Sequence, residues 1–321
     1  MRVGVAIPTW GPFGRVEVLS DVLARVEELG FESAWFSDHV AIPTYATDRF
    51  APPLFEPLAL AGWVLSRFPR LRVGTDVLVA PYRHPVLLAA MAGSIDRLSG
   101  GRLTLGLGVG YLRGEFDALQ IPVGRRGAIT DEVLDALRVL WEGNGPRHFV
   151  GSHVRFDEVL PTAVPTGGVP LWVGGNGDAA RARAATRGDG WHPLYPDPAT
   201  YAKGRADIEV ARERAGRSTP FTYSYSASLC RVLSTRRTEW RSNAGPGTPL
   251  RPEYQYAPDF PYSESGRPLL CGTADEVRGD VEDYRRAGVE HIVLRIWAST
   301  SHLDLDGVID QLGRWAEVFE L

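Results

Sequence analysis

Short apolar runs alternate along this chain with longer segments whose apolar positions recur at helical spacing. The run 3–7 precedes the segment 16–29, where positions 18, 19, 22, 26 and 29 are apolar and fall on one helix face. Gly30 then supplies the stop expected at a helix C-terminus. This alternation predicts consecutive βα units and a parallel sheet.

Eight such units follow one another along the sequence. Strands are expected at 3–7, 34–36, 71–79, 103–107, 171–173, 190–191, 221–233 and 292–296. Helices are expected at 16–29, 54–66, 85–98, 129–141, 178–187, 198–215, 274–287 and 305–319. Eight consecutive units predict an α/β fold of the (β/α)₈ TIM-barrel type, with a doubly wound open sheet as the alternative.

Two segments interrupt the alternation, one after the fourth strand and one after the seventh. Residues 143–168 are rich in Gly and Pro and include a small hairpin expected at 149–156. Residues 235–270 hold six prolines and several aromatic residues. Connections of this length are usually lids or binding segments. We interpret both as insertions in a single domain that spans 1–321.

Composition and charge narrow the class of protein. The chain is 44% hydrophobic and 23% charged, which is typical of a globular protein. Its net charge of −4 is too small to indicate a nucleic acid or membrane-surface partner. No apolar run approaches the roughly 18 residues of a membrane span. Cys230 and Cys271 form neither a metal-ligand spacing nor a disulfide framework, so we expect a reducing cytoplasm.

In a βα barrel the loops that follow the strands form the active site, so polar residues there are the first candidates. Asp38 and His39 follow the second strand, where an imidazole beside a carboxylate suits acid/base chemistry near neutral pH. The alternative is a histidine that caps local backbone. Asp76 interrupts the apolar third strand, which is unfavourable unless its carboxylate is paired or faces a ligand. A bulge or an unusual peptide there would explain it; a solvated aspartate at the rim is the alternative.

Glycines mark the ends of the fourth and fifth strands. The run 106–110 contains Gly108 and Gly110, which let a planar ligand approach the backbone, and Glu115 follows as a pocket carboxylate or as a first-turn acid of a helix. The run 174–177, Gly-Gly-Asn-Gly, leads directly into a helix and favours an anion site, typically for phosphate. A tight turn with a polar cap is the alternative. After the sixth strand, Trp191 and His192 are candidates at the rim. No histidine pair has metal-site spacing, so no metal is expected.

Four stretches of the sequence occur together in a characteristic order. They are ELGFESAWFSDH at 28–39, VGTDVLVAPYRHP at 73–85, DRLSGGRL at 96–103 through GEF at 114–116, and VPLWVGGN at 169–176 through GDGW at 188–191. They span most of residues 1–200. In this combination the chain resembles the luciferase-like monooxygenase superfamily, and within it the oxidoreductases that use the deazaflavin coenzyme F420.

The resemblance implies a TIM barrel with a flavin-type ring at the carboxyl ends of the strands. In relatives a non-prolyl cis peptide bulges the third strand and supports the ring from behind. By position this is the Asp76–Val77 bond, although relatives often have Gly, Ser or Cys in place of the aspartate. His39, Asp38 and Glu115 are the catalytic candidates. The residues expected to bind the cofactor are Asp76, Val77, Val79, Gly108, Gly110, Gly174, Gly175, Asn176, Gly177, Trp191 and His192.

The activity implied is hydride transfer between coenzyme F420 and a small organic substrate. One alternative is an FMN-dependent monooxygenase fed by a separate reductase; others are a flavin-binding barrel without turnover and a metal-dependent hydrolase. Relatives are commonly homodimers. The aromatic residues of 235–270 indicate either a sizeable apolar substrate or a dimer contact.

Overall fold

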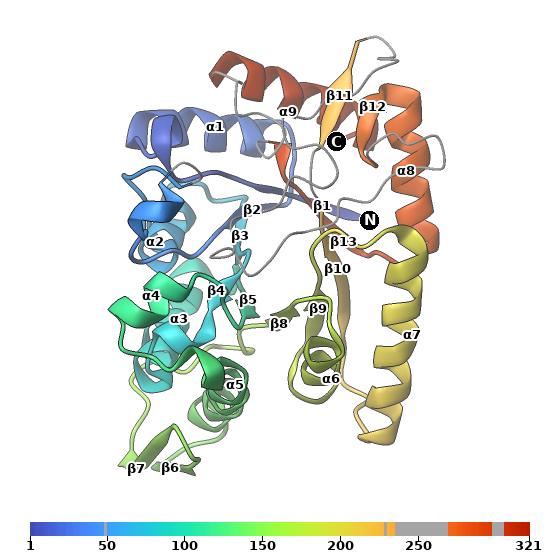
Figure 1. Cartoon of the computed structure of the whole chain (residues 1–321). Helices are drawn as coiled ribbons and strands as arrows, with labels where there is room; N and C mark the ends of the chain where they lie inside the picture. The colour runs from blue at the N-terminus through green and yellow to red at the C-terminus, as the bar shows by residue number, and fades with distance from the viewer. Residues whose placement is uncertain (48–49, 228–229, 235–268, 297–304) are drawn as a thin grey trace.

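Parallel strands close into a barrel in the computed structural model, which describes residues 1–47, 50–227, 230–234, 269–296 and 305–321 (Figure 1). The barrel strands are β1 (Arg2–Ala6), β2 (Ser33–Phe36), β3 (Arg72–Thr75) with its continuation β4 (Leu78–Val79), β5 (Leu103–Gly108), β8 (Leu171–Gly174), β9 (Gly190–His192), β10 (Thr222–Ser226) and β13 (His291–Leu294). Each pairs in parallel with the next, and β13 pairs with β1. This closure confirms the predicted TIM barrel and excludes the open sheet.

Helices surround the barrel (Figure 1). The expected ones are present with small shifts at their ends: α1 (Val16–Glu28), α2 (Pro57–Arg67), α3 (Pro85–Ser99), α5 (Arg126–Trp141), α6 (Asp178–Arg187), α7 (Pro198–Arg214), α8 (Ala274–Arg286) and α9 (Leu305–Phe319). A further short helix, α4 (Arg113–Ala118), follows β5. Short 3₁₀ helices lie at η1 (Gly11–Phe13), η2 (Thr44–Ala46), η3 (Ala80–Tyr82) and η4 (Val123–Arg125). No helix of the described residues is both long and apolar enough to cross a membrane.

The start and end of α3 show how local sequence fixes the helices. Pro85 occupies its first turn, where the fixed φ of proline suits a helix, and the His84 side chain accepts a hydrogen bond from the Val86 amide at 3.3 Å. At the other end Gly100 has φ +71°, a left-handed conformation that favours glycine. The fixed start of α3 also holds Arg83, two positions before the helix, at the carboxyl end of the barrel.

A buried tryptophan fills the middle of the barrel. The indole of Trp35, on β2, stacks on Trp172 of β8 and on the imidazole of His192 of β9, with ring centroids 5.2 and 5.0 Å away. Neighbouring strands make room for it with glycines: a Cβ on Gly74 would lie 2.3 Å from the Trp35 ring, and one on Gly4 would lie 2.6 Å from its Nε1. The indole therefore packs against main chain on both sides.

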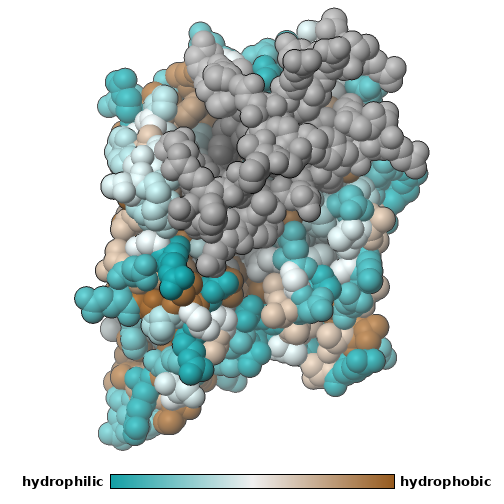
Figure 2. All heavy atoms as spheres, in the orientation of Figure 1, coloured by the Kyte–Doolittle hydropathy of each residue, from teal (hydrophilic) through white to brown (hydrophobic). Residues whose placement is uncertain are grey.

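Two small sheets lie apart from the barrel. The predicted hairpin at 149–156 is confirmed as the antiparallel pair β6 (Arg147–Val150) and β7 (Arg155–Val159), which projects at the lower left of Figure 1. The other is the parallel pair β11 (Arg231–Leu233) and β12 (Cys271–Thr273). Figure 2 shows mostly hydrophilic side chains on the face turned to the viewer. A group of hydrophobic side chains lies on this face near the position of α4.

The prediction of one seventh strand over 221–233 is wrong. The barrel strand β10 ends at Ser226, and 231–233 form β11, which pairs with β12 outside the barrel. Because no Gly or Pro lies between Ser226 and Arg231, the sequence pattern did not locate the break. The third strand predicted over 71–79 is present as β3 and β4, and the interruption between them lies at Asp76 and Val77, where a bulge was expected. In the second insertion, Trp240, Tyr254, Tyr256, Phe260 and Tyr262 lie outside the described residues.

Adding a methyl group at Gly74 is expected to destabilise the barrel. In Gly74→Ala the new Cβ would overlap the Trp35 ring, which has no alternative space, so we expect the free energy of unfolding to fall by about 2 kcal/mol. Gly124→Ala is the matched control because nothing lies within 4 Å of the added atom. Urea unfolding of both variants measures the difference, and equal midpoints would contradict tight packing at Gly74.

Candidate active site

A pocket of about 200 Å³ opens where the carboxyl ends of the barrel strands meet. Its described lining residues are Trp10, Ser37, Asp38, His39, Phe50, Asp76, Val77, Val79, Tyr82, Gly108, Val109, Gly110, Tyr111, Glu115, Gly174, Gly175, Leu194, Tyr195 and Arg295. A second cavity, of about 190 Å³, lies at the opposite end around Arg2 and Glu32. TIM-barrel enzymes place their chemistry at the carboxyl ends of the strands, so the first pocket is the candidate active site.

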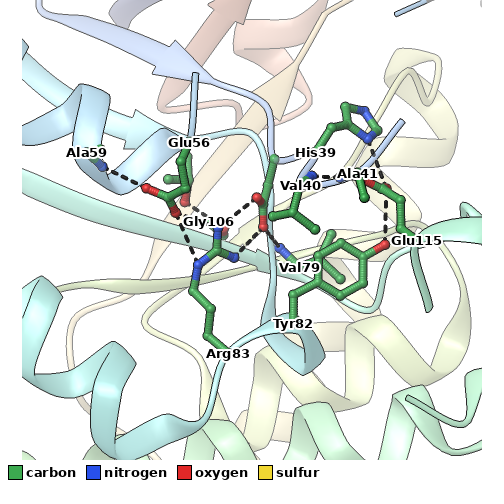
Figure 3. A network of polar contacts seen from close by, with 12 residues as sticks. His39, Val40, Ala41, Glu56, Ala59, Val79, Tyr82, Arg83, Gly106 and Glu115 are labelled. Atoms are coloured by element: carbon green, nitrogen blue, oxygen red, sulfur yellow. Dashed lines mark hydrogen bonds and ion pairs between the residues drawn. The ribbon is translucent and has the colours of Figure 1, made fainter. Parts of the chain in front are cut away.

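The imidazole of His39 is fixed by a buried carboxylate. Its Nδ1 lies 3.1 Å from Oε2 of Glu115, which is 1% exposed. The hydroxyl of Tyr82 donates to the same oxygen at 3.1 Å, and the amides of Val40 and Ala41 donate to Oε1 at 2.8 and 3.3 Å. Figure 3 shows His39 and Tyr82 pointing toward Glu115 from opposite sides. With Nδ1 held in this way, Nε2 has no hydrogen-bond partner among the described residues and remains for a ligand.

Tyr82 acts in this cluster as a donor. Burial, and then the neighbouring Glu115 carboxylate, raise the pKa of Tyr82 well above its ordinary range. The phenol therefore stays protonated and donates to Glu115, which stabilises that carboxylate inside the protein.

Asp38 precedes His39 in sequence but contacts a different set of groups. Its two oxygens accept from the guanidinium of Arg83 at 2.6 and 2.9 Å, and one of them also accepts from the Val79 amide at 2.8 Å. Arg83 in turn contacts Glu56, as Figure 3 shows, at 2.5 and 3.1 Å. Asp38 therefore ties the end of β2 to β4 and to the start of α3, and the acid that orients His39 is Glu115.

The peptide bond between Asp76 and Val77 is cis, as expected from the resemblance, and the Asp76 side chain points into the barrel. Its carboxylate accepts from His192 Nε2 at 3.1 Å, from the Ser226 hydroxyl at 3.1 Å and from the Arg295 guanidinium at 2.6 Å. Burial alone would raise the pKa of this carboxyl, but Arg295, His192 and Ser226 together lower it to about 2. The negative charge is therefore retained in the barrel core, where it is fully paired.

Polar side chains continue from Asp76 toward the other end of the barrel. Nδ1 of His192 lies 2.8 Å from the hydroxyl of Ser224, which lies 3.5 Å from Nδ1 of His291. Nε2 of His291 is 3.2 Å from the Ser33 hydroxyl and 3.4 Å from the Glu32 carboxylate. Burial lowers the pKa of His291 to about 4. This series of polar side chains therefore runs from the Asp76 carboxylate at the pocket to the neutral imidazole of His291 near the other end of the barrel.

Val77 forms the floor of the pocket together with glycines. A Cβ on Gly108 would lie 2.5 Å from Cγ2 of Val77, and one on Gly174 would lie 2.9 Å from its Cγ1. Only glycine lets β5 and β8 approach this side chain so closely. The floor is consequently apolar and is made largely of main chain.

The loop after β8 is braced from behind by residues of the next βα unit. The Asn176 amide donates to the Leu194 carbonyl at 2.5 Å, and its oxygen accepts from the Leu194 amide at 2.9 Å. The indole of Trp191 donates to the Gly175 carbonyl at 2.9 Å, and Gly175 has φ +117°. Asn176 and Trp191 thus support the loop and do not line the pocket.

Helix α6 begins next to this loop. Gly177 is its N-cap residue, and the main-chain amides of Asp178 and Ala179 precede the first intrahelical hydrogen bonds. Such amides, with the positive end of the helix dipole, suit a phosphate group. That assignment stays a prediction.

The structure brings most of the predicted residues to one pocket. Those that line it are Asp38, His39, Asp76, Val77, Val79, Gly108, Gly110, Glu115, Gly174 and Gly175, whereas Asn176, Gly177, Trp191 and His192 lie beside or behind it. Sequence reasoning missed Arg295, Arg83 and Tyr82. Arg295 carried a usable signal, because a cation directly after the apolar strand β13 requires the same explanation as Asp76 within its strand.

The pocket fits a flat ring better than it fits a metal ion. Its floor carries no side chain at Gly108 and Gly174, and His39 is among the residues that line it. In the described ranges, no group of three or more His, Cys, Asp or Glu residues has the geometry of a metal site.

Removing the charge of Asp76 is expected to destabilise the protein, because the buried guanidinium of Arg295 would lose the opposite charge that lies 2.6 Å from it. We expect Asp76→Asn to lower the free energy of unfolding by about 3 kcal/mol at pH 7. The wild-type carboxylate is stabilising above its unfolded pKa of 3.8 and loses this effect as the pH falls through about 2, so the deficit should narrow over that range.

Asp275→Asn, at a side chain that is 96% exposed, is the control for this experiment. Denaturant unfolding between pH 7 and pH 2 measures both variants. A deficit in Asp76→Asn that stays constant with pH would contradict the assigned ionisation.

Comparison with known proteins agrees with this geometry. A family model described as luciferase-like monooxygenase matches residues 5–291. An F420-dependent glucose-6-phosphate dehydrogenase of Amycolatopsis mediterranei is 25% identical over 297 residues, which cover 86% of this chain and 87% of that protein.

Solved structures share the fold at lower identity. An F420-dependent secondary alcohol dehydrogenase, solved with an F420–acetone adduct, has a TM-score of 0.77 at 19% identity and covers 99% of this chain and 97% of its own. The oxygenating component of 3,6-diketocamphane monooxygenase from Pseudomonas putida, in complex with FMN, has a TM-score of 0.73 at 16% identity, again with 99% and 97% covered. With the family match spanning most of its length, this chain belongs to the luciferase-like monooxygenase family.

Proposed function

We propose that this protein is an oxidoreductase that binds coenzyme F420 and transfers a hydride between it and a small organic substrate. The observation that carries the proposal is His39, which is held through Nδ1 by Glu115, has no hydrogen-bond partner at Nε2 among the described residues, and lines the same pocket as Gly108 and Gly174. When bound, the deazaflavin ring would supply the hydride chemistry. The protein would orient the reactants and handle the proton.

The orientation of His39 suits proton transfer at Nε2. A carboxylate accepts only, so Glu115 favours the imidazole tautomer with the hydrogen on Nδ1 and leaves Nε2 as an acceptor. Nε2 can then take the proton of a substrate hydroxyl, or return it to a carbonyl oxygen in the reverse direction. Glu115 also stabilises the protonated imidazole, as the carboxylate does in other acid–His pairs.

The coenzyme would lie on the floor formed by Val77, Gly108 and Gly174. Its phosphate end would reach the amides at the start of α6, beside Gly175 and Gly177. Support for F420 comes from the dehydrogenase relative, which aligns with 86% of this chain. We further propose a homodimer, a cytoplasmic location and an F420 reductase as the source of reduced coenzyme.

The second candidate function is an FMN-dependent monooxygenase supplied with reduced flavin by a separate reductase. The FMN-bound structural neighbour favours it, because a barrel of the same fold holds that ring. The two candidates share the pocket and differ in whether oxygen is consumed.

Coenzyme binding separates these candidates. We expect the purified protein to bind F420 at micromolar concentration, with a change in its visible absorption, and to bind FMN more weakly. Titration of the protein with each compound measures this. Tighter binding of FMN, together with oxygen consumption when reduced FMN is supplied, would favour the monooxygenase, and binding of neither compound would contradict both candidates.

Replacing His39 is expected to separate turnover from coenzyme binding. His39→Asn lacks an ionisable group, so kcat should fall by roughly 10²- to 10⁴-fold while the Kd for the coenzyme changes little. The exposed His153, in the β6–β7 hairpin, provides the control His153→Asn. Unchanged kcat in His39→Asn would remove His39 from catalysis, and no turnover by the wild type with any electron donor would indicate a binding protein.

A further inference from the structure

Two aromatic rings flank the imidazole of His39, and a third packs against one of them. The Phe50 ring centroid lies 4.1 Å from that of His39, and the Tyr111 centroid lies 6.2 Å away with its ring nearly perpendicular. Trp10 packs edge-on against Phe50 at 5.3 Å. The rings come from the loops after β1, β2 and β5, and all three residues line the pocket. Trp10, Phe50 and Tyr111 therefore form an aromatic wall of the pocket beside the imidazole that is expected to move a proton.

This wall is separate from the core of the barrel. Phe50 is buried with Ala46 and Leu112 in a small apolar cluster of the loops, and Trp10 and Tyr111 are partly buried against it. The inner side of the cluster holds these loops together, and its other side forms the wall around His39. A ligand at Nε2 would therefore lie against apolar ring surface.

The charges of the pocket do not favour an anionic substrate. Among the described lining residues the carboxylates are Asp38, Asp76 and Glu115, and the one arginine is Arg295. Arg295 is paired with Asp76 at 2.6 Å, and Glu115 is directed at His39. A phosphate or carboxylate group near His39 would meet more negative than positive charge and would lose its hydration without compensation.

We propose that the substrate is an uncharged alcohol with a flat apolar body, such as an aryl-substituted secondary alcohol, or the corresponding ketone. This inference rests on the proposed function. The oxygen of the substrate lies at Nε2 of His39, and its apolar body lies against Trp10, Phe50 and Tyr111. Aromatic contacts of this kind add to the effect of apolar burial, so the wall selects for rings.

The reaction balances with these groups. Oxidation of the alcohol would break the carbinol C–H bond and form the C=O double bond, with the oxidised coenzyme as the hydride acceptor and Nε2 of His39 as the acceptor of the hydroxyl proton. The proton then leaves His39 for solvent. Reduction of the ketone is the reverse, with the protonated imidazole as the acid and the reduced coenzyme as the reductant.

The inference separates this protein from its relative that is named for glucose 6-phosphate. A sugar phosphate carries two negative charges and many hydroxyl groups, which the aromatic wall cannot satisfy. We therefore expect 1-phenylethanol to be oxidised and acetophenone to bind, whereas glucose 6-phosphate should do neither.

The test measures acetophenone binding to the coenzyme-loaded protein by calorimetry. Turnover of 1-phenylethanol and of glucose 6-phosphate is measured alongside it. Trp10→Ala and Tyr111→Ala should each raise the Kd of acetophenone by roughly 3- to 10-fold. Phe149→Ala removes a ring of the β6–β7 hairpin and should leave that Kd unchanged. Thermal unfolding of each variant confirms that it is folded.

The outcomes distinguish this inference from the proposed function. A protein that binds F420 but not acetophenone, or that oxidises glucose 6-phosphate in preference to 1-phenylethanol, overturns the substrate class alone. The same holds if Trp10→Ala and Tyr111→Ala bind acetophenone as tightly as the wild type. Absence of F420 binding in the separate titration contradicts the proposed function itself.

Discussion

The buried carboxylate of Asp76 joins parts of the barrel that are distant in sequence and in strand order. It accepts hydrogen bonds from β9, from β10 and from the residue after β13, although it belongs to the break between β3 and β4. These strands face one another across the closed barrel. A single charge therefore fixes how the pocket floor sits relative to the opposite wall. Arg295 keeps that charge compatible with burial, so neither residue is stable there without the other.

The pocket has two kinds of support. Below the floor, polar side chains are paired with one another and keep Val77 in place. At the side, Glu115 gathers the His39 imidazole, the Tyr82 hydroxyl and two amides of the loop after β2. Each carboxylate that lines the pocket thus positions neighbouring side chains or amides of the protein. Among the described residues around Glu115, Nε2 of His39 is the one nitrogen without a hydrogen-bond partner. It is therefore the atom of this cluster at which a ligand is expected to bind.

The barrel could be predicted from the sequence because strand-like and helix-like patterns of apolar residues alternate eight times. Each of these patterns can be recognised within a short segment of the chain. The sequence also led to His39, Asp76 and Glu115, since polar residues at the ends of apolar strands require an explanation. It did not predict which acid contacts which partner. Asp38 is adjacent to His39 but pairs with Arg83, whereas Glu115 is 76 positions away and holds the imidazole. Such pairings depend on the closure of the barrel, which sequence spacing does not contain. The break after Ser226 was missed because no Gly or Pro marks it in the sequence.

A floor built of main chain has a consequence for how proteins of this kind diversify. Substitutions at Gly108 or Gly174 would collide with Val77, so new side chains at these positions are disfavoured and the shape of the pocket floor is kept constant. The aromatic residues around His39 project from separate loops and belong to a cluster apart from that floor. The lining that comes from the loops can therefore change while the floor of the pocket stays the same.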